Sequence, residues 1–418
     1  MTWKFESTAW PKPATLASLI TCQPHSFWLD SDAMAHPHAK LSIVGVEPEI
    51  IFDTKQKLAK LEKHLSSGAN PLPLPFAGGA LGFITYEAKF YFVCHRLYWV
   101  YDHSRKKSYL LYQNKDAKLK QQWLKKIKKL ISPVTAVKNP FALSSLRSNF
   151  SRKTYQQTIQ EIIHRIHRGD CYQVNLSQQF KIPFQKNIGE FYLQLRTVSP
   201  APYMAFINTG TEIILSNSPE CFLKIQGREI ISRPIKGTRP RGQTKKQDLQ
   251  LKTELFKSQK DAAELLMITD LMRNDLGKIS TPGSVKVPSL KKVETFSNVH
   301  HLVATVTATL ASNITPLQAF LSASPAGSIT GAPKLKAMEI IRELEPNPRG
   351  IYTGSIGYID FRGNAAFNVA IRTALFKNNQ LYFNSGGGIV ADSDPASEYE
   401  ETLYKAKNFL KLLLLRRT

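Results

Sequence analysis

Three glutamates lie on two segments that have the apolar spacing of helices. Glu264 is in the middle of residues 259–276, and Glu398 and Glu401 lie three residues apart on one face of a helix expected over roughly 395–415. Carboxylate oxygens are the ligands that Mg²⁺ prefers, and Mg²⁺ keeps coordination positions open for a substrate. If the two helices meet, the three carboxylates can hold this cation; if not, they are solvated residues of two helix faces.

Lys236 is a candidate nucleophile. It stands in "SRPIKGTRPRG" (232–242), between an isoleucine and a glycine, with Arg233 and Arg239 close in sequence. Neighbouring positive charges disfavour protonation of an amine, and a neutral lysine amine is a nucleophile. The alternative is that Lys236 is a solvated or salt-bridged charge.

Two features could bind an acid group. Gly386 to Gly388 are consecutive glycines in "NSGGGIVAD", at the end of an expected strand, where backbone N–H groups could cradle a carboxylate or phosphate. A flexible turn is the alternative, and a dinucleotide site is not indicated because no GxGxxG leads into a helix. Arg372, in the strand-like "VAIRTALF", needs an anion there, either a structural carboxylate or a ligand.

His301 and Glu220 are two further candidates. His301 follows His300 in "NVHHLVATV", and in a strand the two side chains point to opposite faces. One of them could belong to a site, or be a hydrogen-bonded structural histidine. Glu220, in "SNSPECFL", would by itself be taken for a solvated carboxylate of a turn.

The residues named above must be positioned by strands and helices, which the sequence predicts in the following order. The first ~130 residues hold short β-like runs and a basic amphipathic helix over 115–131, and the Pro- and Ser-containing stretch 132–151 is the expected boundary. Further helices are expected over 151–169, over 259–276, from Thr330 to Pro346 and over 395–415. Three strands joined by "RGN" and "KNN" should be antiparallel neighbours. Meandering strands with separate long helices predict an α+β fold.

The composition is that of a globular chain with a large core, with 418 residues, 42% of them hydrophobic. The formal net charge of +24 suits an anionic partner, whether nucleic acid, an acidic membrane or a small multiply charged acid. No apolar run reaches the roughly 18 to 20 residues that span a bilayer, and no signal peptide is apparent. The four cysteines form no CxxC pair, which favours a reducing cytoplasm over a disulfide framework or zinc site.

Eight segments in order carry a resemblance to a known family: "PIKGTRPRG", "DAAELLMITDLMRNDLG", "VHHLVATV", "GSITGAPKLKAMEII", "GSIGYIDF", "AIRTALF", "GGGIVADS" and "EYEET". The chain resembles the chorismate-utilising enzymes, strongly over about 150–410 and more loosely before that. The resemblance implies an N-terminal region over 1–135 and a chorismate-binding catalytic domain over 150–410. It also implies a large sandwich of antiparallel β-sheets flanked by helices, in agreement with the α+β prediction.

The resemblance assigns roles to these residues. Glu264 and Glu401, with Glu398 nearby, would bind Mg²⁺, which would grip the ring carboxylate of chorismate. The enolpyruvyl carboxylate would be held by Arg372, Tyr358 and the amides of Gly386, Gly387 and Gly388. His301 would lie near the reacting edge of the ring, and four more residues would surround the substrate: Gly237, Thr238, Thr330 and Gly331. Ser324 replaces an aromatic residue that is common in the family, which implies a packing change.

Two positions separate the branches of the family. Isochorismate- and salicylate-forming members activate water with a lysine where this chain has Gln173, which cannot be a general base. Anthranilate-forming members typically have Ala at the position of Lys236. The resemblance therefore implies formation of 4-amino-4-deoxychorismate, on the route to para-aminobenzoate and folate, with Lys236 as nucleophile at C2 and Glu220 as acid and base. Component I of an anthranilate synthase is the alternative.

The resemblance also bears on partners. The chain has no glutaminase signature, so ammonia should come from a separate glutamine amidotransferase subunit. "WLDS" (28–31) and "APYM" (201–204) are similar to two segments that bind tryptophan in some relatives, which suggests a tryptophan pocket at Ser31, Pro202, Tyr203 and Met204; Trp28 and Asp30 depart from the usual "LLES". A nucleic-acid-binding protein is the rival of another class, supported only by the basic run 104–130 and by no recognition module.

Overall fold

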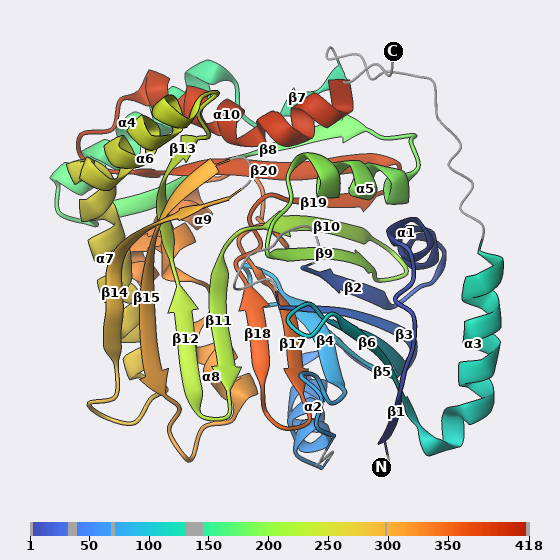
Figure 1. Ribbon diagram of the computed structural model, residues 1–418. Helices are drawn as coiled ribbons and strands as arrows, with labels where there is room; N and C mark the ends of the chain where they lie inside the picture. Colours follow the sequence, from blue (N-terminus) through green and yellow to red (C-terminus); the bar gives the residue numbers. More distant parts are fainter. Residues whose placement is uncertain (1–2, 32–39, 68–71, 131–144, 297–298, 415–418) are drawn as a thin grey trace.

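The computed structural model describes residues 3–31, 40–67, 72–130, 145–296 and 299–414. Their strands form one hydrogen-bonded system of 20 strands, in which every pairing of named strands is antiparallel. Figure 1 shows strands from both ends of the chain meeting in the middle of the molecule, with helices around the outside. The predicted α+β fold with antiparallel sheets is confirmed.

The first part of the chain is rich in strands. Its elements are β1 (Trp3–Ser7), α1 (Pro13–Cys22), β2 (Ser26–Asp30), β3 (Leu41–Phe52), α2 (Lys55–Ser67), β4 (Gly79–Ile84), β5 (Phe90–Asp102), β6 (Lys107–Gln113), the short 3-10 helix η1 (Asn114–Asp116) and α3 (Ala117–Lys129). The helix expected over 115–131 is thus α3, and its buried Trp123 attaches it to the strands. Residues 131–144, most of the expected boundary at 132–151, lie outside the described residues.

The middle of the chain runs from residue 147 to residue 309. Its elements are β7 (Arg147–Ser148), α4 (Arg152–His167), β8 (Gln173–Pro183), α5 (Ile188–Val198), β9 (Tyr203–Asn208), β10 (Ile213–Ser218), β11 (Cys221–Gln226), β12 (Glu229–Arg233), β13 (Ile235–Pro240), α6 (Lys245–Lys257), α7 (Gln259–Gly277), β14 (Lys286–Thr295) and β15 (Val299–Thr309). The Ser151 side chain caps α4, as expected, by accepting a hydrogen bond from the Thr154 N–H.

The last part holds three helices and five strands among the described residues. They are α8 (Pro316–Ala323), η3 (Gly327–Ile329), β16 (Gly331–Ala332), α9 (Lys334–Leu344), β17 (Ser355–Asp360), β18 (Ala365–Asn368), β19 (Thr373–Lys377), β20 (Gln380–Ile389) and α10 (Pro395–Leu414), with η3 a single 3-10 turn. The expected antiparallel neighbours are found as the β17–β18 and β19–β20 pairs. One detail was wrong: the strand expected over "AAFNVAIRTALF" is broken into β18 and β19, and Arg372 lies in the break with a φ of 50°.

Two strand pairs join the first part of the chain to later parts: β2 pairs with β9 of the middle part, and β4 pairs with β17 of the last part. Strand alternation puts Phe27 of β2 into one hydrophobic core and Trp28 into another, so this strand is covered on both faces. The division of the chain into a region over 1–135 and a catalytic domain over 150–410 stays a prediction, since strands of both are hydrogen-bonded together.

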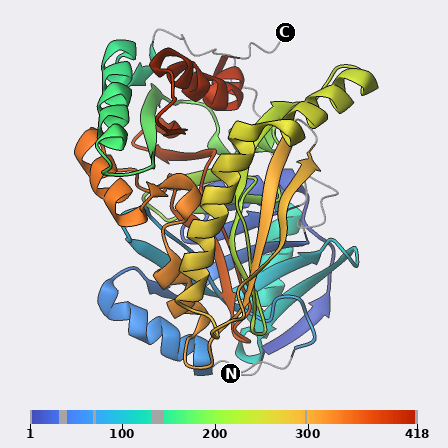
Figure 2. The same ribbon diagram turned by 90° about the vertical axis from the view of Figure 1, so that its left-hand side faces the viewer.

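Helices cover the strands that carry the predicted site. Figure 2 shows α7 running along the outside of the β13–β15 strands, and α7 packs on β13, β14 and β15. The helix α10 packs on β20 and α4. The two glutamate-bearing helices thus cover different strands, α7 those that include β13 and α10 the strand β20. No helix among the described residues is long and apolar enough to cross a membrane.

Candidate active site

Lys236 is held on a distorted strand. It lies on β13, opposite Leu302 of β15, and the register of this pair shifts between Lys236 and Thr238. Gly237 at the shift has a φ of 75°, and a Cβ placed there would lie 2.8 Å from the Asp261 carboxylate. Both facts require glycine at this position. The irregularity sets the direction of the Lys236 side chain, whose Nζ lies 3.8 Å from Glu264 Oε2 of α7.

The surroundings of Lys236 favour a neutral amine, for a reason that differs from the expected one. Burial lowers the pKa of Lys236; Glu264 acts in the opposite direction, and the nearby Lys405 ammonium lowers the pKa further. The two arginines named from the sequence are each paired with a carboxylate, Arg233 with Glu294 and Arg239 with Asp261. The like charge that matters comes from α10, which is distant in sequence.

Glu220 is a buried carboxyl group close to this lysine. It lies in the short link between β10 and β11 and accepts a 2.6 Å hydrogen bond from Ser328 Oγ. Burial raises its pKa to about 7, although the Ser328 hydrogen bond and the Lys236 charge act in the opposite direction. A solvated turn carboxylate is therefore excluded, and at neutral pH Glu220 can either donate or accept a proton.

The other two glutamates approach Lys236 through the glycines of β20. A Cβ placed on Gly387 would lie 3.0 Å from Glu398 Oε2 and 3.4 Å from Glu401 Oε1, and one on Gly388 would lie 3.2 Å from Lys236 Nζ. Gly386 to Gly388 are not in a turn: they pair with β8 inside the strand. Side chains at Gly387 and Gly388 would fill the space beside Glu398, Glu401 and Lys236.

The carboxylate oxygens of Glu264, Glu398 and Glu401 are donor atoms that suit Mg²⁺. Burial raises the pKa of Glu398, and Glu401 raises it further. Burial also acts against ionisation of Glu401, but Lys405, at 2.5 Å, outweighs it and the pKa is lowered. In the described part of the chain no three His, Cys, Asp or Glu side chains are close enough together to hold a metal ion as they stand. Mg²⁺ needs fewer, because water and substrate oxygens complete its coordination.

His301 and Arg372 form a second group beside β13. His301 Nδ1 lies 2.8 Å from Thr238 Oγ1, and Arg372 Nη2 lies 3.5 Å from His301 Nε2. Burial and the Arg372 charge lower the pKa of His301 to about 3, so the ring is neutral at pH 7. Burial lowers the pKa of Arg372 to about 10, and no described carboxylate forms an ion pair with it. The guanidinium is thus available for an external anion.

Thr330, Gly331 and Gln173 close the site from the β8 side. Thr330 is buried and donates its hydroxyl to backbone carbonyls, and Gly331, with a φ of 143°, pairs with Val174. Gln173 is buried next to Gly388, and its Nε2 has no hydrogen-bond partner among the described residues. An orphaned donor at this place suits a ligand oxygen or water.

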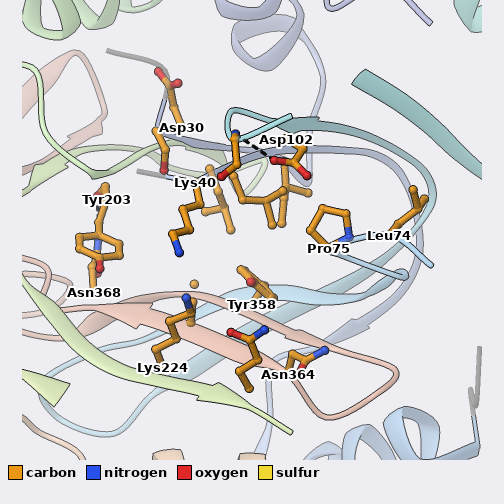
Figure 3. Close-up of a pocket in the computed structure, with 18 of the residues that line it drawn as sticks. Asp30, Lys40, Leu74, Pro75, Asp102, Tyr203, Lys224, Tyr358, Asn364 and Asn368 are labelled. Atoms are coloured by element: carbon orange, nitrogen blue, oxygen red, sulfur yellow. Dashed lines mark hydrogen bonds between the residues drawn. The ribbon is translucent and has the colours of Figure 1, made fainter. Parts of the chain in front are cut away.

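Tyr358 does not lie with this group. It lines another cavity, of about 610 Å³, together with Ser31, Tyr203 and Met204, while the Pro202 carbonyl accepts a hydrogen bond from Ser31 Oγ. Figure 3 shows Tyr203 and Tyr358 at this cavity. Strand alternation puts the Tyr358 ring on the face of β17 that meets this cavity, where the ring packs against Phe76.

Two residues of the site were missed from the sequence. Lys405 touches both Glu401 and the Gly386 carbonyl, and its spacing of four residues from Glu401 on a helix could have indicated it. Ser328, the partner of Glu220, is 108 positions away from it in the chain, and no local pattern indicates the contact.

A family model for chorismate binding enzymes matches residues 24–411. The chain belongs to this family. Among its curated relatives, aminodeoxychorismate synthase component 1 of Klebsiella aerogenes is 39% identical, with 95% of this chain and 95% of the relative covered, and that of Escherichia coli is 38% identical with the same coverage. Anthranilate synthase component 1 of Bacillus subtilis is 36% identical, covering 82% of this chain and 74% of the relative.

Solved structures of the family show the same fold. Anthranilate synthase component I of Streptococcus pneumoniae superposes with a TM-score of 0.80 at 28% identity, covering 90% of this chain and 92% of the other. The menaquinone-specific isochorismate synthase of Escherichia coli superposes with a TM-score of 0.82 at 20% identity, covering 99% and 94%. The resemblance inferred from the eight segments is therefore confirmed at the level of the family and the fold.

Proposed function

We propose that the chain converts chorismate and ammonia to 4-amino-4-deoxychorismate and water, with Mg²⁺ bound and with ammonia supplied by a separate glutamine amidotransferase subunit. The observation that carries the proposal is the Lys236 amine: it is largely buried, its pKa is lowered, and it lies among Glu264, Glu220 and the glycines of β20. Two full-length relatives named for aminodeoxychorismate synthase support it.

The reaction is proposed in two displacements. The neutral Lys236 amine forms a bond to C2 of the ring, the two conjugated ring double bonds shift, and the C4 hydroxyl leaves as water with a proton from Glu220. Ammonia then forms a bond to C4, the two double bonds shift back, and the C2–N bond breaks to release Lys236. The proton lost by the incoming nitrogen passes to a base in each half, and Glu220, with a pKa of about 7, can serve in both directions.

The two carboxylates of chorismate would be bound by different groups of the site. Bound Mg²⁺ would supply charge neutralisation at the ring carboxylate, and Glu264, Glu398 and Glu401 are the residues that would hold it. Arg372 would pair with the enolpyruvyl carboxylate, since its guanidinium has no described carboxylate partner. The neutral His301 would hold the ring edge by a hydrogen bond, positioned by Thr238.

Ammonia rather than water is the proposed nucleophile at C4. Gln173 stands buried beside Gly388 and can donate or accept a hydrogen bond but cannot take a proton from water. Glutamine-dependent turnover should therefore require an added amidotransferase subunit, whereas ammonium salts should support turnover by the chain alone. Turnover of glutamine by the isolated chain would contradict this division of labour.

Anthranilate formation is the second candidate, because an anthranilate synthase component 1 is 36% identical to this chain. In that reaction ammonia would bond directly to C2 and pyruvate would leave. A lysine amine at the ring would then have no covalent part. The two reactions give products of different mass, so product identification separates them.

The test is the intact mass of the protein after incubation with chorismate and Mg²⁺ but without ammonia. The proposal expects an adduct of chorismate less water on the peptide that contains Lys236. Addition of ammonium should then discharge the adduct and release 4-amino-4-deoxychorismate. An unmodified protein that nevertheless forms this product would overturn the covalent role, and anthranilate as the main product would overturn the proposed reaction.

A further inference from the structure

Arg349, in the segment between α9 and β17, is a buried charge that the proposed reaction does not use. Its side chain is 1% exposed, and its guanidinium lies 4.6 Å from the centre of the Tyr86 ring and 5.9 Å from that of Tyr352. Its ion-pair partner Glu345 is buried as well. A charge taken out of water in this way needs a partner for every one of its N–H groups.

The guanidinium makes five hydrogen bonds, which is the number of its N–H groups. Two of them reach the Glu345 carboxylate, from Nε at 2.9 Å and from Nη2 at 2.7 Å. The other Nη2 bond, at 2.6 Å, goes to the Asn175 carbonyl. Nη1 binds the Ile329 carbonyl at 2.9 Å and Thr353 Oγ1 at 3.4 Å. A lysine could not make this set, because its ammonium is a single point at the end of its chain.

The two carbonyls belong to segments that both border the active site. Ile329 is in η3, next to Ser328, whose hydroxyl binds Glu220. Asn175 is in β8 and pairs with Gly388 of β20, the glycine beside the proposed nucleophile. The guanidinium therefore connects the turn that carries the partner of the acid and base to the strands beside the reacting amine.

Glu345 adds to the connection with β8. Its Oε1 accepts hydrogen bonds from the Ser177 N–H at 2.8 Å and from the Ser177 hydroxyl at 3.0 Å. The Asn175 N–H in turn donates to the Thr330 carbonyl at 2.8 Å, so β8 and the end of η3 also meet directly. The ion pair thus stabilises a junction at which η3 lies against β8.

Stability alone does not account for a buried ion pair at this junction. The desolvation of two charges offsets their attraction, and replacement of both by apolar side chains of similar volume is often neutral or stabilising. Apolar side chains cannot, however, bind two backbone carbonyls. The property that only the charged pair provides is the fixed geometry of the two segments.

We propose that Arg349 is a positioning residue of the active site, which holds η3 against β8 through the Ile329 and Asn175 carbonyls. The fixed η3 keeps the Ser328 hydroxyl at hydrogen-bond distance from Glu220. Arg349 acts through these residues and is assigned no contact with the substrate. The inference rests on the proposed function, because the position of Ser328 takes effect in that reaction.

Loss of Arg349 should show itself at Glu220. Burial raises the pKa of Glu220, and the Ser328 hydroxyl acts in the opposite direction. The Lys236 charge and the Ile235 backbone also act against burial, but neither of them is on η3. Glu220 must be protonated when the C4 hydroxyl leaves, so kcat should fall as pH rises through its pKa. Release of η3 weakens the Ser328 bond, which should raise this pKa further and move the alkaline limb of kcat to higher pH.

The test replaces both members of the ion pair. Arg349→Met/Glu345→Leu should keep a Tm near that of the wild type, because no charge is left buried and unpaired. Its kcat should fall by about tenfold or more, with the alkaline limb at higher pH. Wild-type kcat with the limb in place would overturn the proposal. A double variant that does not fold would also overturn it, because stability would then account for the pair.

Arg165→Met/Glu343→Gln is the matched control. Arg165 binds Glu343 through two N–H groups, both at 2.7 Å, and thereby joins α4 to α9 without reaching η3 or β8. This variant should keep the wild-type kcat and alkaline limb. If its limb moves as far as that of Arg349→Met/Glu345→Leu, the shift comes from the attachment of α9, and the proposal is wrong.

Arg349→Lys separates the hydrogen bonds from the charge. It keeps a cation beside Glu345 but loses the forked geometry, so it should show the same kinetic change as the double variant. Ser328→Ala and Arg349→Lys together should move the limb no further than the larger of the two single shifts, since both act through one bond. Shifts that add would show that Arg349 does not act through Ser328.

Amide hydrogen exchange gives a readout that does not depend on the reaction. In Arg349→Met/Glu345→Leu the N–H groups of Asn175 and Thr330 should exchange about tenfold or more faster than in the wild type, and in the control variant they should not. Unchanged exchange would overturn the role of Arg349. If the wild type forms no 4-amino-4-deoxychorismate, the proposed function is wrong, and hydrogen exchange still decides whether Arg349 holds η3 against β8.

Discussion

Burial lowers the pKa of three described lysines, Lys224, Lys236 and Lys334, and the groups around the first two differ. Lys236 is accompanied by carboxylates: Glu264 at 3.8 Å, and Glu220 and Glu401 near enough to act on its pKa. Lys224 lines the cavity that also holds Tyr358 and faces a second ammonium group, Lys40, which lowers its pKa further. Cys221 and Glu229 act in the opposite direction, but no described carboxylate forms an ion pair with Lys224. Burial is the first cause of the lowered pKa in both places. The neighbours decide the chemistry: carboxylates provide proton acceptors beside the Lys236 amine, whereas the ammonium group of Lys40 provides none beside Lys224.

Removal of Lys236 should have the largest effect. Lys236→Ala should lower kcat for 4-amino-4-deoxychorismate by about 10³-fold or more, because the C4 hydroxyl loses its displacement route. Traces of product aminated directly at C2 are expected instead. Lys224→Ala is the matched lysine removal in the other cavity, and its rate should equal that of the wild type. A rapid discontinuous assay with mass detection of products makes the comparison. If Lys236→Ala forms the same product at nearly the wild-type rate, Lys236 is no more necessary for the reaction than Lys224, and its role as nucleophile is wrong.

Loss of one carboxylate beside Lys236 should come next. Glu264→Gln should lower activity by roughly 10²-fold or more while leaving the far-UV circular dichroism unchanged, because a neutral amide is a poor Mg²⁺ ligand. Glu254→Gln, on the exposed face of the preceding helix α6, is the control and should be fully active. EDTA should silence the wild type, and added Mg²⁺ should restore it. Full activity in EDTA would remove the metal from the proposal.

The sequence predicted the elements better than it predicted their junctions. The bounds of α7 were predicted within a residue because the apolar spacing and the capping Ser258 are local signals. Arg372 was expected within a strand, and the break there depends on contacts from outside the segment, such as the hydrogen bond from the Asn217 N–H to its carbonyl. Tyr358 needed knowledge of which face of β17 meets Phe76. These contacts join residues far apart in the chain, so a local pattern cannot contain them.

The pH dependence of kcat should show the ionisation of Glu220. Lys236 must be neutral and Glu220 must be protonated when the C4 hydroxyl leaves, so kcat should fall on the alkaline side as pH rises through about 7, the pKa of Glu220. Glu220→Gln should lower kcat by about 10²-fold and abolish this alkaline limb. An unchanged pH profile in Glu220→Gln would assign the limb to another group.

Glu220 should also make the stability of the folded protein depend on pH. Its pKa in the folded protein is about 7, above the ordinary value of 4.5, so the unfolded chain loses this proton first as pH rises. The contribution of Glu220 is therefore fully present below about pH 4.5 and is lost progressively up to about pH 7. The Tm of Glu220→Gln, measured by differential scanning calorimetry, should gain on that of the wild type between these pH values and not above them. A Tm difference that is constant with pH would show that Glu220 has an ordinary pKa.

The smallest effect should come from Ser328, which acts on Lys236 only through Glu220. Its hydroxyl donates a 2.6 Å hydrogen bond to Glu220 Oε1, and this bond favours the ionised carboxylate. Ser328→Ala should therefore raise the pKa of Glu220 and move the alkaline limb of kcat to higher pH, with a loss of only about two- to tenfold at the optimum. Ser324→Ala, which removes a hydroxyl bonded to the Phe320 carbonyl, is the matched control and should leave the limb in place. A limb that moves to lower pH in Ser328→Ala would contradict the direction of the hydrogen bond. A limb that moves equally in both variants would show that packing around η3, rather than the bond to Glu220, sets the proton balance beside Lys236.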